Sequence, residues 1–113
     1  MPGRLEGPPM KILFDQGTPA PLRKTLAPHL IATAFEMGWA GVKNGDLLAV
    51  AEKVFDAFIT TDNDPGYQQN PSGRRLAILV LPTTSWPEIQ KHLGRIFDAV
   101  NVLKPGDFVE MKF

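Results

Sequence analysis

Five acidic side chains occupy positions that favour metal chemistry: Asp15, Glu36, Asp46, Asp62 and Asp64. Four of them follow short apolar runs, and Asp46 instead opens an amphipathic segment. Mg²⁺ and Mn²⁺ prefer oxygen ligands, and they often take few protein carboxylates and fill their other positions with water and phosphate. A cation held in this way activates water and stabilises charge on a phosphodiester. These residues therefore predict metal-dependent phosphodiester hydrolysis, provided that the fold brings them together.

Each of these acids also has a purely structural interpretation. Asp15 could cap a following helix, and Asp46 in a first helical turn would complement the helix dipole. Asp62 could form a turn after its strand, and Glu36 could be a solvated loop residue. The set is more informative than its members, because like charges gathered at one place repel one another unless a cation neutralises them.

The elements that would position the acids alternate along the chain. Apolar runs predict strands, and apolar residues three or four apart predict helices. The predicted strands span 11–14, 30–35, 57–61, 76–81 and 108–112, and the predicted helices span 19–26, 44–55 with Asn44 as a cap, and 88–102. This alternation predicts an α/β fold with a mainly parallel sheet that is covered on both faces.

A parallel sheet places the acids on one edge. Right-handed crossovers bring the carboxyl ends of the strands and the amino ends of the following helices to the same side of the sheet. Open α/β sheets bind their ligands at that edge, where the strand order reverses. We therefore expect the five carboxylates, although distant in sequence, to lie along one edge.

Length and composition limit the possibilities further. The 113 residues predict one domain over residues 10–113. Residues 1–9 are rich in proline and glycine, and we interpret them as a disordered arm, a cloning remnant or the result of a start codon assigned too early. The absence of cysteine excludes disulfides and thiolate metal sites. A net charge of zero argues against binding nucleic acid mainly by phosphate neutralisation. No signal peptide or membrane-length apolar run is evident, so we expect a cytoplasmic protein without membrane contact.

Several other side chains are candidates for binding a substrate. Lys43, just before the helix of Asp46, could contact a phosphate or simply balance the acids. Tyr67, Gln68 and Asn70 lie in the crossover that leaves the acidic edge, where they could stack on or hydrogen-bond a nucleotide, or only order a long loop. Arg75 and its neighbour Arg74 precede a strand, so they are expected at the opposite edge of the sheet. The pair could be an RNA-binding patch, but a solvated strand end is the simpler interpretation.

At the acidic residues the sequence resembles the PIN-like domain family of short prokaryotic proteins, relatives of the VapC-type toxin ribonucleases. The resemblance runs from about Met10 to the end of the chain. The matching stretches are KILFD, EMGWAGVKNGDLLAVAE, TTD, YQQNPSGRRLAILVLPTTS and LKPGDFVEM. The second and fourth of these stretches are the most specific.

The resemblance implies a three-layer α/β/α Rossmann-like fold and a Mg²⁺- or Mn²⁺-dependent ribonuclease site. Carried over position by position, Asp15, Asp46 and Asp62 would be the catalytic and metal-binding acids, and Glu36 would be a further metal ligand. The resemblance also implies an RNA substrate, an antitoxin partner if the chain is the toxin of a toxin–antitoxin pair, and a homodimer.

Two alternatives remain open. The chain departs from the family at Gln16 and Gly17, where a second acid is common, and at Asp46, where glutamate is more frequent. These departures favour a non-catalytic PIN-like binding module with a degenerate acidic site. A receiver-like signalling domain also gathers aspartates at one sheet edge, and the pair Lys104 and Pro105 superficially fits it, although this pair precedes a strand instead of following one.

Overall fold

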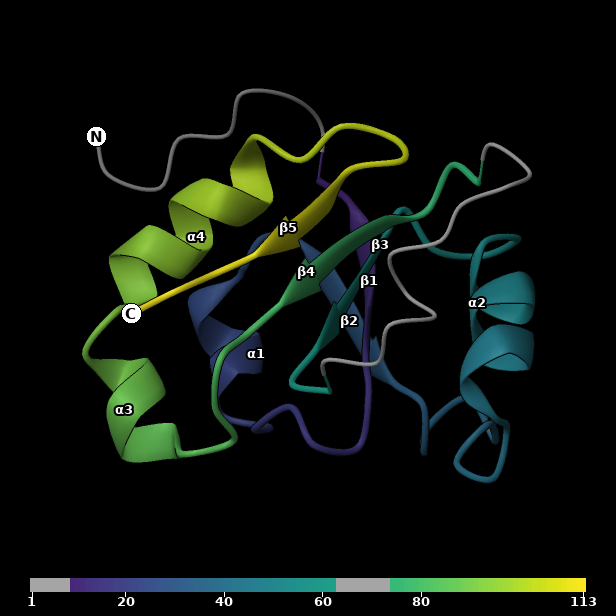
Figure 1. Ribbon diagram of the computed structural model, residues 1–113, viewed down its shortest axis with the longest axis horizontal. Coiled ribbons are helices and arrows are strands. Elements are labelled where there is room, and N and C mark those ends of the chain that lie inside the picture. The colour runs from purple at the N-terminus through teal and green to yellow at the C-terminus, as the bar shows by residue number, and fades with distance from the viewer. Residues whose placement is uncertain (1–8, 63–73) are drawn as a thin grey trace.

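A five-stranded sheet forms the centre of the computed structural model, which describes residues 9–62 and 74–113 (Figure 1). The strands are β1 (Lys11–Phe14), β2 (Leu30–Thr33), β3 (Ala57–Thr60), β4 (Ala77–Val80) and β5 (Phe108–Glu110). Each strand lies within a predicted strand, with trimmed ends where the predicted runs extended into the following turns. The α/β class predicted from the alternation of elements is thus confirmed.

All four strand pairs are parallel, and the strand order is β2-β1-β3-β4-β5. The chain moves outward from β1 in one direction to β2 and then returns past β1 to β3. The order therefore reverses between β1 and β3, and the carboxyl ends of these two strands flank the position where open α/β sheets commonly bind ligands.

The helices are α1 (Leu22–Thr25), α2 (Asn44–Ala51), α3 (Trp86–Gln90) and α4 (Leu93–Asn101). The helix predicted over 88–102 is wrong in one respect, because it is divided into α3 and α4. His92 separates the two with a φ of −129°, outside helical geometry. Ser85 begins α3 as its N-cap, and its side chain accepts a hydrogen bond from the Glu88 amide.

The second predicted helix also differs from the observed one at both ends. α2 begins at Asn44, and the residue at its N-cap is Lys43 with an extended backbone, so the prediction that Asn44 is the cap was one residue late. The helix ends at Ala51, and Phe55 is buried beyond it in the turn that leads to β3. The apolar spacing continued past the helix end because Phe55 still faces the core beyond Ala51, whereas Val54 is exposed.

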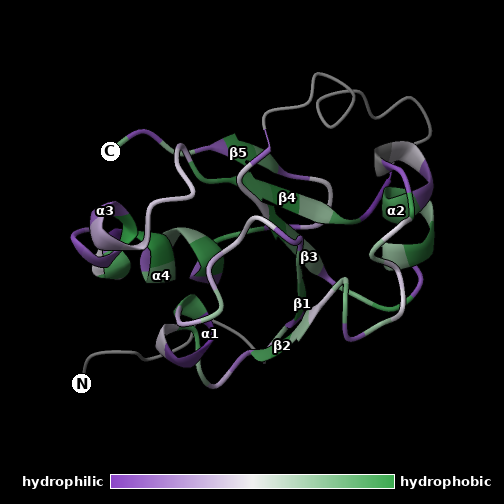
Figure 2. Cartoon of the chain, turned by 90° about the horizontal axis from the view of Figure 1, so that it is seen from below, coloured by the Kyte–Doolittle hydropathy of each residue, from purple (hydrophilic) through white to green (hydrophobic). Residues whose placement is uncertain are grey.

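Alternate side chains of the strands pack into two separate clusters, because successive residues of a strand face opposite sides of a sheet. Ile12 and Phe14 join a cluster with residues of α1, α3 and α4, whereas Leu13 and Phe58 join a second cluster with residues of α2. Figure 2 shows the hydrophobic strands between α2 on one side and the other helices on the other side. Both faces of the sheet are therefore buried, as the apolar strands predict.

In the described ranges, the helices are too short to cross a bilayer.

Candidate functional site

Asp15 follows β1 directly, and its carboxylate is fixed by hydrogen bonds from two other segments. Its Oδ1 accepts from the Thr18 amide at 3.0 Å and lies 2.6 Å from the Thr18 hydroxyl. Its Oδ2 accepts from the hydroxyl of Thr60, the last residue of β3. Thr60 is fully buried and Thr18 nearly so. A charged side chain is thus held in one orientation at the point where the strand order reverses.

These hydrogen bonds leave little of the Asp15 carboxylate free. An ionised carboxylate offers about four lone-pair positions. Oδ1 uses one position on the Thr18 amide and lies beside the Thr18 hydroxyl, whose single proton is also within reach of the Ile59 carbonyl at 3.0 Å. Oδ2 uses one position on Thr60. With respect to the described residues, at least one position therefore remains, on Oδ2, for a cation or a donor that enters from outside.

Asp62 lies on the same edge, two residues beyond the end of β3. Its amide donates a hydrogen bond to the Thr60 hydroxyl at 3.0 Å, so one hydroxyl connects the two acidic residues. Asp15 and Asp62 both line a hollow of about 280 Å³, together with residues such as Trp39 and Thr61. The structure thus brings together two of the three acids that were predicted as catalytic.

Gly17 lines the same hollow and packs tightly against β3. A Cβ atom at this position would lie 2.5 Å from the Thr61 hydroxyl oxygen. Only glycine therefore fits without moving Thr61. The glycine at position 17 thus coincides with a close approach of the loop after β1 to the end of β3.

Asp46 and Lys43 stand at the amino end of α2, and both side chains are exposed. Asp46 lies in the first helical turn, where its charge complements the helix dipole. Leu47 lines the hollow, but neither Asp46 nor Lys43 does. The structure therefore does not bring Asp46 into the hollow with Asp15 and Asp62.

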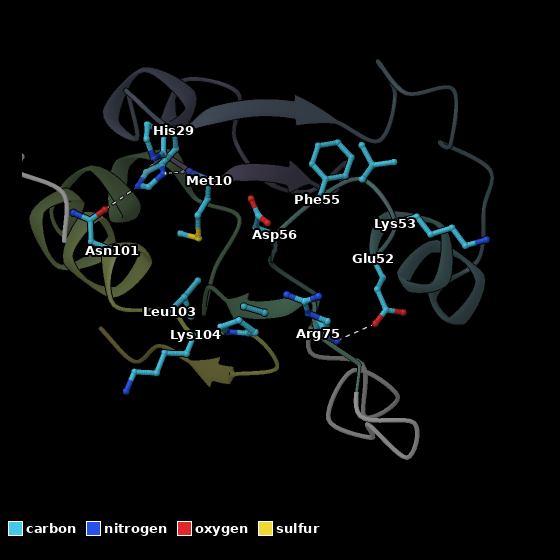
Figure 3. A pocket seen from close by; sticks show the side chains of 14 residues that line it. Met10, His29, Glu52, Lys53, Phe55, Asp56, Arg75, Asn101, Leu103 and Lys104 are labelled. Atoms are coloured by element: carbon cyan, nitrogen blue, oxygen red, sulfur yellow. Dashed lines mark hydrogen bonds between the residues drawn. The ribbon is translucent and has the colours of Figure 1, made fainter. Parts of the chain in front are cut away.

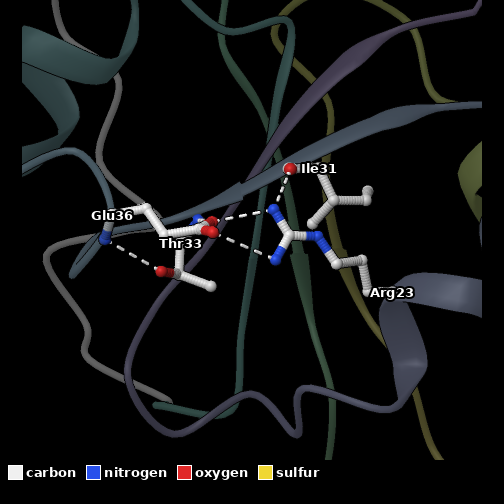
Figure 4. A network of polar contacts seen from close by, with 4 residues as sticks. All are labelled: Arg23, Ile31, Thr33 and Glu36. Atoms are coloured by element: carbon white, nitrogen blue, oxygen red, sulfur yellow. Dashed lines mark hydrogen bonds and ion pairs between the residues drawn. The ribbon is translucent and has the colours of Figure 1, made fainter.

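Glu36 is engaged elsewhere, in a bidentate ion pair with Arg23 of α1 (Figure 4). The two side chains meet at 2.8 and 3.2 Å, and Glu36 Oε1 also accepts from the Thr33 amide at 2.9 Å. The hydrogen bond from Arg23, followed by the one from the Thr33 amide, lowers the pKa of Glu36 below its ordinary value of 4.5. Glu36 is thus an ionised partner of Arg23, and it does not line the hollow.

The Arg23–Glu36 pair also covers part of the free side of β2, which is an edge strand. Arg23 donates to the carbonyl of Ile31 at 2.5 Å, Glu36 accepts from the amide of Thr33, and the Thr33 carbonyl accepts from the Met37 amide. Unpaired groups of an edge strand are templates for pairing with another chain. Three outward groups of β2 are occupied within the chain itself.

Four of the predicted residues lie outside the described ranges: Asp64, Tyr67, Gln68 and Asn70. Among residues 9–62 and 74–113, no three His, Asp or Glu side chains come close enough to hold a metal ion together. A site with three carboxylate ligands is not formed by the described residues. Two described carboxylates, those of Asp15 and Asp62, line the hollow. Carboxylate oxygens are the kind of ligand that hard cations prefer, with water and phosphate oxygens in the remaining positions.

Two residues that orient Asp15 were not predicted from the sequence. Thr18 and Thr60 carry no charge, and threonines are common in turns and strands. Thr60 belongs to the TTD stretch, so its place at a strand end, two residues before an acid, was the one available signal. Hydrogen bonds that orient a ligating carboxylate are typical of metal sites.

Lys104 and Pro105 lie before β5, in the loop that leads to its amino end. They line a cavity together with Met10 and Asp56, which precede β1 and β3. Because all strands are parallel, this edge is opposite to the one that carries Asp15. The lysine that a receiver-like site would need beside its aspartates is therefore at the wrong end of the sheet.

No family model, no curated protein and no solved structure matches this chain.

Proposed function

We propose that the chain is a PIN-like, three-layer α/β/α Rossmann-like domain that cleaves RNA in the cytoplasm with Mg²⁺ or Mn²⁺ held at the hollow of Asp15 and Asp62. The observation that carries this proposal is the fixed orientation of Asp15 by Thr18 and Thr60 at the strand reversal. A carboxylate that served only as a local cap would need Thr18 alone. The additional hydrogen bond from Thr60 of β3, the neighbouring strand in the sheet, favours a carboxylate that is oriented for a ligand.

The residues of the hollow have separate roles in this proposal. Asp15 presents Oδ2, its oxygen with a free lone-pair position, and Asp62 contributes a second, exposed carboxylate. Thr60 fixes both residues, because its hydroxyl donates to Asp15 and accepts from the Asp62 amide. A cation bound there would supply an activated water and charge stabilisation at the phosphodiester. Asp46 remains outside the hollow and has no role in this proposal.

The test is a cleavage assay on single-stranded RNA with Mn²⁺, comparing the wild type with Asp15→Asn and Asp62→Asn. We expect both substitutions to abolish cleavage, because each removes one of the two anionic ligands. Asp98→Asn is the matched control, since Asp98 is an exposed aspartate of α4 that does not line the hollow. Cleavage that survives in Asp15→Asn, or that is lost equally in Asp98→Asn, would overturn the proposal.

A second candidate function is the non-catalytic PIN-like binding module. The specific observation in its favour is that Asp46 and Glu36 do not join Asp15 and Asp62 at the hollow, and Glu36 is paired with Arg23. In this case the hollow binds a cation or RNA without hydrolysis. Metal binding that Asp15→Asn removes, together with absent cleavage of any RNA by the wild type, would favour the binding module.

An antitoxin partner and a homodimer belong to the proposal only through the resemblance to toxin ribonucleases. The toxin assignment predicts that expression of the chain arrests growth and that Asp15→Asn relieves the arrest. The homodimer predicts a doubled mass in solution. Neither outcome is needed for the cleavage test to be decisive.

A further inference from the structure

A second cavity, of about 470 Å³, opens at the amino ends of β1, β3 and β4 (Figure 3). This edge is opposite to the hollow of Asp15, so the cavity is a separate site. Its volume lies in the range of small-molecule pockets, which is about 300–1,000 Å³. Arg75 lies at this edge, as the sequence predicted.

Asp56 and Arg75 give the cavity two opposite charges that are not paired with each other. Figure 3 shows both side chains directed into the space of the cavity, whereas the ammonium group of Lys53 points away from it. Asp56 Oδ2 accepts from the Lys11 amide at 2.9 Å, and within residues 9–62 and 74–113 its Oδ1 has no hydrogen-bond donor. In the same ranges the Arg75 guanidinium forms no ion pair.

The backbones of both residues are fixed, so their side chains cannot approach by a movement of the chain. The Asp56 amide donates to the Lys11 carbonyl at 2.8 Å, and its carbonyl accepts from the Ala77 amide at 3.1 Å. The Arg75 amide donates to a carboxylate oxygen of Glu52 at 2.9 Å, and its carbonyl accepts from Gly106 at 2.8 Å. These backbone contacts place the two charged residues just before two adjacent strands, and both side chains line the same cavity.

The rest of the lining combines apolar residues with a few polar ones, of which His29 and Asn101 are hydrogen-bonded to each other. Met10 and Leu103 form one side of the cavity, and Phe55 and Ala77 are buried beside it. Of the other charged residues of the lining, Glu52 is engaged by the Arg75 amide and by Arg74. Lys53 and Lys104 are exposed, as Asp56 and Arg75 also are. A ligand that complements this lining needs an anionic group, a cationic donor and an apolar body.

We propose that this cavity binds a small zwitterion with an apolar side chain, of the class of the free α-amino acids. The ligand carboxylate pairs with the Arg75 guanidinium, and the ligand ammonium donates to Asp56 Oδ1. The apolar side chain lies against Met10 and Leu103. One ligand thus satisfies both charges, which no single anion or cation would do.

The experiment is an NMR titration of the full chain with L-phenylalanine and with two analogues that each lack one charge. Phenethylamine lacks the carboxylate, and 3-phenylpropionate lacks the ammonium group. We expect saturable shifts at the amides of Asp56 and Ala77, with L-phenylalanine binding about fivefold more tightly than either analogue, the gain of an exposed ion pair. Equal binding of L-phenylalanine and 3-phenylpropionate, or no saturable shift at tens of millimolar, would overturn the proposal.

Two conservative variants assign the charges. Arg75→Gln should weaken the binding of L-phenylalanine about fivefold and leave the binding of phenethylamine unchanged. Asp56→Asn should also weaken the binding of L-phenylalanine about fivefold, but it should leave the binding of 3-phenylpropionate unchanged. Asn at position 56 can still accept from the Lys11 amide, so the fold is retained. Lys53→Gln is the control, because Lys53 lines the cavity but points away from it. Equal losses in all three variants would contradict the assignment, and the analogue comparison on the wild type remains decisive if a variant does not fold.

Discussion

The hydroxyl of Thr60 donates a hydrogen bond to Asp15 and thereby joins the ends of two adjacent strands. The same hydroxyl accepts from the amide of Asp62. This arrangement makes an uncharged, fully buried residue the link between the two acids of the hollow. The geometry of the candidate site therefore depends on Thr60 as much as on the acids.

Replacement of Thr60 by valine tests this link. Valine has nearly the same shape but leaves Asp15 Oδ2 and the Asp62 amide without their partner. We expect the free energy of unfolding in urea to fall by about 1–3 kcal/mol, the cost of unsatisfied polar groups. Thr25→Val is the control, because Thr25 has no hydrogen bond from its hydroxyl to the described residues. An equal loss in both variants would mean that the hydroxyl of Thr60 contributes nothing specific.

The close approach of Gly17 to Thr61 predicts a compensating pair of substitutions. Gly17→Ala would place a methyl group 2.5 Å from the Thr61 hydroxyl oxygen and should cost about 1–3 kcal/mol, as overpacking does. Thr61→Ala removes that oxygen, so the double variant should recover most of the loss. Denaturant unfolding of the four proteins gives the coupling energy. Strict additivity would contradict the contact.

The ion pair of Glu36 and Arg23 predicts a dependence of stability on pH. Because folding lowers the pKa of Glu36 from its ordinary value of 4.5, the pair stabilises the fold above that value. This contribution is lost as the pH falls through the lowered pKa. Glu36→Gln should therefore lose less stability than the wild type between neutral pH and the acid range. NMR titration of the Glu36 carboxyl carbon checks the direction, and a midpoint at or above 4.5 would contradict it.

The same ion pair predicts the behaviour of the β2 edge. Arg23→Ala frees the Ile31 carbonyl and releases Glu36 from its partner, and Phe35 beside it is 69% exposed. An uncovered edge with an apolar neighbour should pair with another chain, so we expect concentration-dependent association by light scattering. Arg95→Ala is the control, because Arg95 donates to the Lys112 carbonyl away from β2. If the Arg23→Ala variant associates no more than this control at the same concentration, the ion pair does not protect the edge.

Local patterns predicted the elements because most of them are specified by nearby residues. The apolar run from Lys11 to Phe14 coincides with β1, and Asp15 lies at its carboxyl end as expected. The division of the last helical segment at His92 was missed, because its apolar spacing continues across the break. Periodicity records which side chains face the core and does not record where the backbone turns.

The candidate site could be predicted only in part, because its geometry depends on contacts distant in sequence. Asp15 and Asp62 were placed by strand ends alone, and they do line one hollow. The partner of Glu36 is Arg23, thirteen residues away on another element, so no local pattern could assign it. The cavity lined by Asp56 and Arg75 was not predicted, for the same reason. The positions of these two residues before two parallel strands were nevertheless a signal that they share an edge.

The most direct test of the central claim is calorimetric titration of the purified protein with Mn²⁺, beside Asp15→Asn and the control Asp98→Asn. The claim that Asp15 and Asp62 hold a divalent cation predicts saturable binding by the wild type and the control. Asp15→Asn should bind at least about tenfold more weakly, because an anionic ligand is lost. Equal binding by all three proteins, or no binding at millimolar Mn²⁺, would contradict a metal site at this hollow.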